Sequence, residues 1–317
     1  MSEMKIFSKS IPSMTSHLDI ALVYDADKGE EAAHLIAQGF AEAERLINII
    51  SAWQDNTELY AVNQQAGIQP VKVCEELFYL IKRSIKISEL TNGLFDVTFA
   101  SIDKVWYFDR PMVEMPTAQA IADSVKNIDY RHIRLDEANK TVFIANKGTK
   151  IELGAIGKGF IAQKIKLKMQ ASGVTGGLIN AGGDLITWGK NEAGKAWRVG
   201  IADPEKKQKH LAFLPLEDMG VATSGSYERF ALINGEKYSH IIHPKTGYPV
   251  KGIHSVTVMS RDAELCDAIA TSVFLLGREA GMAFINQFDD LQCFIIDEQL
   301  NYYYSDNLKK VNYEVTH

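Results

Sequence analysis

The chain has 317 residues, of which 46% are hydrophobic, 23% charged and 9% aromatic. This composition excludes an intrinsically disordered chain, which would hold fewer large apolar residues and a more one-sided charge. The net charge of −6 argues against a general nucleic-acid-binding protein, because that function needs a clustered basic face. The length allows two modest domains or one large intertwined unit.

The cysteines and the apolar stretches limit which kinds of site and which cellular compartment the protein can have. Cys74, Cys266 and Cys293 are too few and too scattered for a disulfide framework or a thiolate metal site, and Cys266 is best explained as a small core residue. The longest uncharged apolar stretch has about ten residues, against the roughly 20 that span a bilayer. Because no apolar signal-peptide core is present, the sequence predicts a cytoplasmic protein without a membrane span, or a periplasmic one if a leader was removed.

The first half of the chain predicts helices mixed with short strands. Apolar residues recur at helical spacing over residues 26–52 and 75–90, and the second stretch ends at Asn92-Gly93. Apolar and polar residues alternate on both sides of Asn139, which predicts a hairpin. A strand at 18–24 and a helix at 156–170, entered from a glycine turn, complete this half.

The second half is richer in strands. GLINAGG, WRVGIAD and HSVTVMS each read as a strand, and ERFALI and EKYSHII form a pair joined by Asn234-Gly235. Both residues of that dipeptide tolerate the positive φ of a type I′ hairpin turn. Asp262 is placed to cap a helix that runs to Leu276. Because hairpins argue against a purely parallel sheet, the predicted fold class is α+β.

Asp267 and Thr271 lie four residues apart on the predicted helix at 262–276. This spacing puts a carboxylate and a hydroxyl on one helical face, with Ala270 close beside them. Both are hard oxygen donors of the kind that suits Mg²⁺. Taken alone, the pair is more commonly explained without a metal, with Asp267 as a surface acid and the Thr271 hydroxyl bonded to its own helix. An acid in the middle of so apolar a helix, however, needs a partner.

The segment IELGAIGKGF, residues 151–160, ends a strand in a glycine turn and opens a helix. Such a turn presents backbone N–H groups and the positive end of the helix dipole, which favour phosphate, and Lys158 adds a cation. It is not a P-loop, because Glu152 stands where that motif needs glycine and Gly159 where it needs serine or threonine. Tight packing of strand against helix explains the glycines equally well.

Two further glycine-bearing turns are predicted, at residues 176–185 and 221–230. The second carries three hydroxyl side chains, those of Thr223, Ser224 and Ser226. These could bind phosphate or ribose, or simply form the turn. In YSHIIHPKTGYPV, the pair His240 and His243 lacks a third ligand for zinc, and a loop that grips a ligand ring or phosphate is an alternative.

The order of these segments resembles one known family. LTNGLFDVTFAS, IELGAIGKGFIAQKI, GLINAGGDL, VATSGSYERF, YSHIIHPKTGYPV and CDAIATSVFLLG follow one another as in the FAD:protein FMN transferase family, the ApbE family. The resemblance runs from about Met14 to beyond Gly277. It implies a T-fold-related arrangement of largely antiparallel sheets with flanking helices, in two intertwined subdomains, with residues 1–317 forming a single flavin transferase domain.

The resemblance also implies a reaction. A transferase of this family cleaves FAD with Mg²⁺ and joins FMN, through its phosphate, to a threonine or serine hydroxyl of a target flavoprotein, releasing AMP. The implied partners are FAD and the acceptor segment, and the implied cofactor is Mg²⁺, which neutralises charge at the transferring and leaving oxygens.

The family's site residues carry over to matching positions. The metal would be held by the Asp267 carboxylate, the Thr271 hydroxyl and the main-chain oxygens of Ala155 and Ala270. The implied catalytic residues are Asp267, Thr271 and Lys158, and Asp267 is near enough to orient or deprotonate the acceptor hydroxyl. The implied FAD pocket consists of Met14, Trp53, Leu94, Phe95, Asp96, Glu152, Lys158 and Ile242.

Three positions depart from the usual family pattern. Glu152 and His243 stand where aspartate is usual, and Trp53 stands where tyrosine is often found. An aromatic residue at position 53 favours transfer over hydrolysis of FAD. Two alternatives stay open: a Mg²⁺-dependent FAD pyrophosphatase that uses water as the acceptor, and a non-catalytic flavin-binding module.

Overall fold

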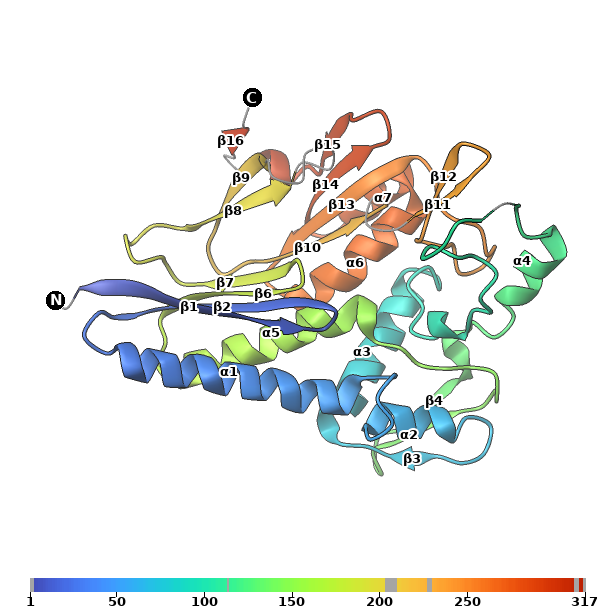
Figure 1. Cartoon of the computed structure of the whole chain (residues 1–317), viewed down its shortest axis with the longest axis horizontal. Coiled ribbons are helices and arrows are strands. Elements are labelled where there is room, and N and C mark those ends of the chain that lie inside the picture. The colour runs from blue at the N-terminus through green and yellow to red at the C-terminus, as the bar shows by residue number, and fades with distance from the viewer. Residues whose placement is uncertain (1–2, 113, 203–209, 227–229, 311–313, 316–317) are drawn as a thin grey trace.

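An eight-stranded sheet runs through the middle of the molecule (Figure 1). The structure is a computed structural model and describes residues 3–112, 114–202, 210–226, 230–310 and 314–315. Every neighbouring pair of strands in this sheet is antiparallel. In spatial order the strands are β1 (Met4–Ser13), β2 (Ser16–Asp25), β6 (Gly176–Ala181), β7 (Asp184–Trp188), β10 (Gly220–Gly225), β13 (Ile253–Ser260), β14 (Gln292–Asp297) and β15 (Tyr302–Tyr304).

Three helices cover one face of this sheet: α1 (Gly29–Ile50), α5 (Gly154–Ala171) and α6 (Ala263–Leu276). The opposite face carries a small sheet of β8 (Trp197–Ala202), β9 (His210–Leu216) and β16 (Glu314–Val315). A second hydrophobic cluster joins that small sheet to β10, β13 and β14. Strand β13 is therefore covered on both faces, which explains why nearly all of its residues are buried.

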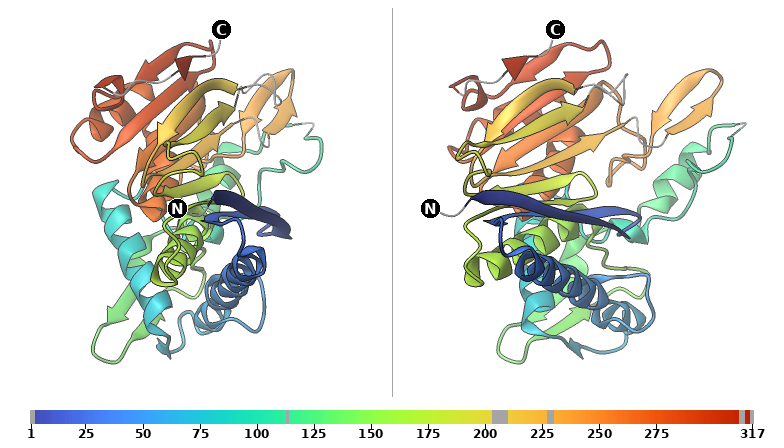
Figure 2. Two further views of the ribbon diagram at one scale, coloured as in Figure 1. Left: turned by 90° about the vertical axis from the view of Figure 1, so that its left-hand side faces the viewer. Right: turned by 60° about the vertical axis from the view of Figure 1, so that its left-hand side comes forward.

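The other elements form two smaller units beside the sheet (Figures 1 and 2). One contains α2 (Glu58–Gln64), α3 (Glu75–Leu90) and a sheet of β3 (Val71–Lys72), β5 (Thr141–Ile144) and β4 (Ile133–Asp136). The other joins α4 (Ala118–Ser124) to the hairpin of β11 (Phe230–Ile233) and β12 (Glu236–Ser239) through a third hydrophobic cluster. The remaining helices are α7 (Arg278–Ile285), η1 (Phe99–Ser101), η2 (Tyr130–His132) and η3 (Leu308–Lys310).

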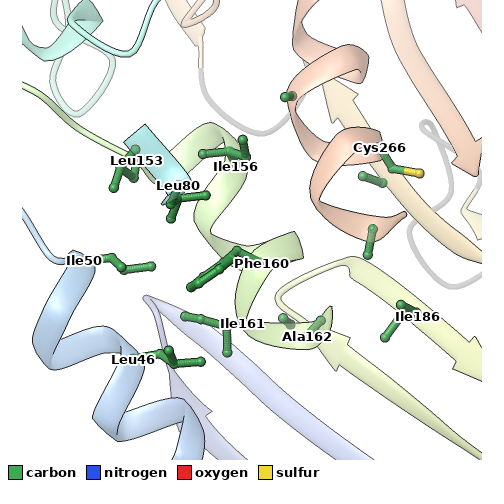
Figure 3. Close-up of a cluster of buried hydrophobic side chains, with 14 of the residues drawn as sticks. Leu46, Ile50, Leu80, Leu153, Ile156, Phe160, Ile161, Ala162, Ile186 and Cys266 are labelled. Atoms are coloured by element: carbon green, nitrogen blue, oxygen red, sulfur yellow. The ribbon is translucent and has the colours of Figure 1, made fainter. Parts of the chain in front are cut away.

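The largest hydrophobic core extends from Leu18 to Ile295 in sequence. Phe160 of α5 lies at its centre, with Leu46 and Ile50 of α1 nearby (Figure 3). Cys266 on α6 is fully buried, which confirms its prediction as a packing residue. All three cysteines are free thiols.

Most of the predicted elements are present, and the α+β fold class is confirmed. The two long helices and the hairpins at Asn139 and Asn234 lie where they were expected, and Asp262 caps α6 by accepting a hydrogen bond from the Leu265 N–H at 3.1 Å. Residues 203 and 228–229 of the predicted strands lie outside the described part of the chain. Among the described helices, none has both the length and the apolar character needed to cross a membrane.

Two segments differ from the prediction. Strand β1 was not anticipated; it pairs with β2 through a tight turn in which Met14 and Thr15 have positive φ without any glycine. Residues 221–230 were expected to form a glycine-bearing turn, but 220–225 form strand β10 inside the main sheet, and 227–229 lie outside the described residues. A Cβ on Gly220 would lie 2.7 Å from the Ala263 Cα, so a glycine there allows close approach to α6.

Candidate active site

A cavity of about 530 Å³ lies where α5 and α6 meet the ends of the central strands. This volume falls within the range of small-molecule binding sites. Its walls come from segments that are far apart in sequence. The lining residues fall within 94–99, 152–158, 180–185, 199–200, 221–225, 240–242, 255–257 and 267–275, together with Leu214.

The cavity gathers nine of the twelve predicted site residues: Leu94, Phe95, Asp96, Glu152, Ala155, Lys158, Ile242, Asp267 and Thr271. Asp267 and Thr271 of α6 and the glycine turn that opens α5 therefore line one cavity. The Asp96 carboxylate, however, accepts hydrogen bonds from the Thr98 N–H and hydroxyl and from the Tyr130 N–H, so it is largely used in holding its own loop.

Three predicted residues do not line the cavity. Met14 lies in the β1–β2 turn and packs against the main core. Ala270 is fully buried within α6. Trp53 is 75% exposed, but its side chain is close enough to the carboxyl group of Glu152, which does line the cavity, to lower the pKa of that group against the raising effect of burial. Trp53 therefore stands beside the site with most of its ring surface in solvent.

The Asp267 carboxylate is held between α6 and α5. Its Oδ2 accepts a hydrogen bond from the Gly159 N–H at 3.5 Å, and its Oδ1 lies 3.5 Å from the Lys158 Nζ. A Cβ on Gly159 would lie 2.3 Å from the Ala263 carbonyl oxygen, so only glycine allows α5 to approach this closely. The buried acid in the apolar helix thus has the partners that its burial requires.

Further oxygen-bearing residues line the same cavity as this carboxylate. The Thr271 hydroxyl lies 3.1 Å from the Ser224 hydroxyl of β10. Ala155 lies in the first turn of α5 with φ −88° and ψ 15°, a kink that turns its carbonyl from the regular helical direction. Carboxylate, hydroxyl and main-chain carbonyl oxygens are the donors that Mg²⁺ prefers, so this set fits a magnesium ion.

Acidic groups outnumber cations in the cavity. Among the described residues, Asp96, Glu152, Asp184 and Asp267 line it together with one lysine, Lys158. Burial, and then the charge of Asp267, raise the pKa of both Glu152 and Asp184. Burial alone would lower the pKa of Lys158, but the charges of Asp267 and Asp184 outweigh burial and raise it. An additional cation would relieve this excess of carboxyl groups.

Sequence reasoning missed Asp184, whose only signal is its place directly after Gly182-Gly183. Its carboxylate accepts a hydrogen bond from the Lys158 ammonium. Thr223 and Ser224 line the cavity, as they must if their hydroxyls are to bind phosphate or ribose. The Ser226 hydroxyl instead donates a hydrogen bond to the His254 carbonyl.

The two histidines of the segment 238–250 have different surroundings. His240 lines the cavity and His243 does not. The Nδ1 of His243 instead accepts a hydrogen bond from the Lys245 N–H at 3.2 Å, as an aspartate oxygen would in the same turn. Burial, and then the charge of Lys245, lower the pKa of His243, which suits an accepting neutral ring. Within the described ranges, no three His, Cys, Asp or Glu side chains form a group that could hold a metal ion, so a zinc site built on this pair has no support there.

Known proteins resemble this chain over most of its length. The model of the ApbE family matches residues 14–295. The FAD:protein FMN transferase of Treponema pallidum (strain Nichols) is 31% identical over 289 residues, which are 86% of this chain and 80% of the relative. One from Klebsiella pneumoniae (strain 342) is 28% identical over 298 residues, 93% of this chain and 90% of the relative.

The fold comparison agrees with the sequence comparison. The ApbE protein of Thermotoga maritima superimposes with a TM-score of 0.85 at 25% identity, covering 96% of this chain and 98% of the other. The flavin transferase ApbE of Vibrio cholerae also gives 0.85 at 25% identity, covering 98% of this chain and 100% of the other. With sequence and fold matching over nearly the full length, and with the predicted residues converging on one cavity, this chain belongs to the ApbE family.

Proposed function

We propose that the chain is an FAD:protein FMN transferase. It would cleave FAD, attach FMN through its phosphate to a threonine or serine hydroxyl of a target flavoprotein, and release AMP. The observation that carries the proposal is the meeting of Asp267, Thr271, Ala155 and Lys158 in one cavity, from two helices about a hundred residues apart. The relatives that match the chain are named for this activity.

A magnesium ion is part of the proposal. The Asp267 carboxylate, the Thr271 hydroxyl and the main-chain oxygens of Ala155 and Ala270 would hold it. The burial of Asp267 and the excess of carboxyl groups over ammonium support a cation at this place. When bound, Mg²⁺ would supply neutralisation of the charge that develops on the phosphate oxygens.

FAD would enter with its pyrophosphate toward Lys158 and its rings toward the rim. Among the described residues that line the cavity, Lys158 is the one lysine, so it would offset phosphate charge. The exposed ring of Trp53, beside Glu152, offers a flat surface for an aromatic ring system. Leu94, Phe95 and Ile242 would supply apolar contacts.

The transfer step balances without any further reactant. The oxygen of the acceptor hydroxyl forms a bond to the phosphorus of the FMN half, the bond from that phosphorus to the bridging oxygen breaks, and AMP leaves with the bridging oxygen. Lys158 would stabilise negative charge as it shifts onto AMP, and Asp267 would help to orient the hydroxyl, whose proton is released to solvent as the new bond forms.

One assay separates transfer from hydrolysis. The purified chain is incubated with FAD, Mg²⁺ and the flavin-accepting subunit of a redox complex, and the denatured products are examined for flavin fluorescence on a gel. A fluorescent acceptor band supports transfer. Free FMN and AMP without a labelled acceptor would favour the pyrophosphatase, and bound but uncleaved FAD would favour a flavin-binding module.

A further inference from the structure

We propose that Asp184 is a positioning residue that holds the Lys158 ammonium aside, so that the Asp267 carboxylate stays open to a divalent cation. This inference rests on the magnesium site of the proposed function. Lys158 reaches both carboxyl groups: it donates a hydrogen bond to Asp184 Oδ2, whereas its Nζ is 3.5 Å from Asp267 Oδ1. The hydrogen bond of the ammonium therefore goes to Asp184, and Asp267 is its second ion-pair partner.

The position of Asp184 is fixed by the turn that precedes it. Gly182 and Gly183, with φ of 65° and 102°, join β6 to β7, and Asp184 is the first residue of β7. The Gly183 N–H donates to Asn180 Oδ1 at 2.8 Å, and the Asn180 amide donates to Asp19 Oδ2 at 2.9 Å. These contacts tie the turn to the neighbouring strand β2.

The same turn packs against the lysine. A Cβ on Gly182 would lie 3.6 Å from the Lys158 Cδ and 3.3 Å from the Ser16 Cβ. The methylene chain of Lys158 thus runs past a turn without side chains and ends at the carboxyl group of Asp184, a residue that is only 3% exposed. Backbone and side chain together define one place for the ammonium.

Removing Asp184 has a specific consequence. A lysine ammonium with only 30% of its side chain exposed needs an acceptor, and Asp267 is the remaining carboxyl group with which Lys158 forms an ion pair in the described structure. The ammonium would then occupy the carboxylate on which the metal site depends. Asp184 keeps the two cations, lysine and metal, on separate oxygens.

The test is the affinity of the full chain for Mg²⁺, measured by calorimetry with AMP present so that no turnover occurs. Asp184→Ala should weaken Mg²⁺ binding by about tenfold or more, the scale of one charge-assisted hydrogen bond redirected onto Asp267. Asp184→Asn keeps an acceptor oxygen in place and should bind Mg²⁺ nearly as well as the wild type. If Asp184 acted only through its negative charge, the two variants would bind Mg²⁺ equally weakly, which would contradict the positioning role.

The double variant Asp184→Ala with Lys158→Met distinguishes positioning from damage to the fold. Without the competing ammonium, Mg²⁺ affinity should return to that of Lys158→Met alone. An Asp184→Ala protein that binds Mg²⁺ like the wild type, or a double variant as weak as Asp184→Ala, would overturn the inference while FMN transfer by the wild type stands. A wild type that labels no acceptor and binds no Mg²⁺ would instead remove the proposed function and the inference together.

Discussion

Asp267 is the residue on which the proposed chemistry depends most. Asp267→Ala removes the one carboxylate of the proposed metal site, so turnover of FAD should be lost, while the contacts of Glu152 and Trp53 should preserve part of the FAD binding. AMP release and the quenching of flavin fluorescence measure the two effects. Glu264→Gln is a matched control, because its carboxylate lies on the same helix but pairs with Arg83 at 2.6 Å. Normal turnover by Asp267→Ala would refute the site.

Gly159 tests the close contact between α5 and α6. In Gly159→Ala the new methyl group would meet main-chain atoms of Ala263 and Glu264 at 2.3 to 2.8 Å, so the helices must separate. We expect a loss of about 3 kcal/mol in the free energy of unfolding, together with lost turnover, since the Gly159 N–H would move from Asp267. Chemical denaturation measures the first effect.

Gly157→Ala is the control on the same helix. Its Cβ would lie 3.1 Å from the Ile50 Cδ1, the end of a flexible side chain, and alanine improves helix propensity by about 1 kcal/mol. Equal destabilisation by the two substitutions would show that the contact at Gly159 is not special.

Among the elements, α1, α3 and α5 are tied together by one charged cluster. Arg45 of α1 donates to Glu42 at 2.6 Å and to Glu76 of α3 at 2.7 Å, and Lys168 of α5 donates to Glu42 at 3.0 Å. The hydrogen bonds from Arg45, and then from Lys168, overcome the effect of burial and lower the pKa of Glu42 to about 2.

Glu42→Gln should therefore destabilise the protein in a pH-dependent way. Because the folded pKa lies below the unfolded value of 4.5, the stabilisation by ionised Glu42 is present above pH 4.5 and is lost as the pH falls toward 2. We expect a loss of about 1 kcal/mol near pH 7 and a smaller loss near pH 3, measured by urea denaturation. The exposed Glu44→Gln is the control, and a deficit that does not shrink with falling pH would contradict the account.

Local pattern was enough to predict the elements that carry strong periodicity or a turn signal. The helix with apolar residues Leu77, Leu80 and Ile81 on one stripe is α3, and Asn234-Gly235 joins β11 to β12. Strand β1 carried no such signal, because its residues are mostly exposed and its turn uses Met14 and Thr15 rather than glycine. Strand β10 was mistaken for a turn because Gly225 and the neighbouring hydroxyl residues also favour turns. Gly220 at its start instead allows close packing against α6.

Local sequence pattern also predicted part of the site. The i,i+4 spacing of Asp267 and Thr271 places both on one helical face, which the cavity confirms. Spacing could not reveal that Asp184 lies beside Lys158, because that contact depends on how β7 packs against α5. Nor did it separate His240 from His243, although the His243 ring accepts a hydrogen bond from the Lys245 N–H within its own turn.

At the scale of the molecule, the cavity draws on residues 94 to 275 and the main core on residues 18 to 295. We therefore propose that the chain acts as one folding and functional unit. Urea unfolding should follow a single transition, coincident in tryptophan fluorescence and far-UV circular dichroism, because Trp53, Trp106, Trp188 and Trp197 are spread over different units. Two separated transitions would instead indicate independently stable domains.

The net charge of −6 is compatible with an anionic substrate, because positive charge is supplied locally in the cavity. Lys158 lies in the cavity, and the carboxyl groups around it favour a bound cation that a pyrophosphate can share. The overall surface need not be basic.

The most direct test of the central claim is the intact mass of the acceptor protein after incubation with the chain, FAD and Mg²⁺. The account predicts that the acceptor gains the mass of FMN less one water, that one AMP appears for each labelled acceptor, and that changing the acceptor threonine or serine to alanine abolishes both the mass gain and the linked AMP. An acceptor of unchanged mass, with FMN and AMP accumulating in solution, would contradict it.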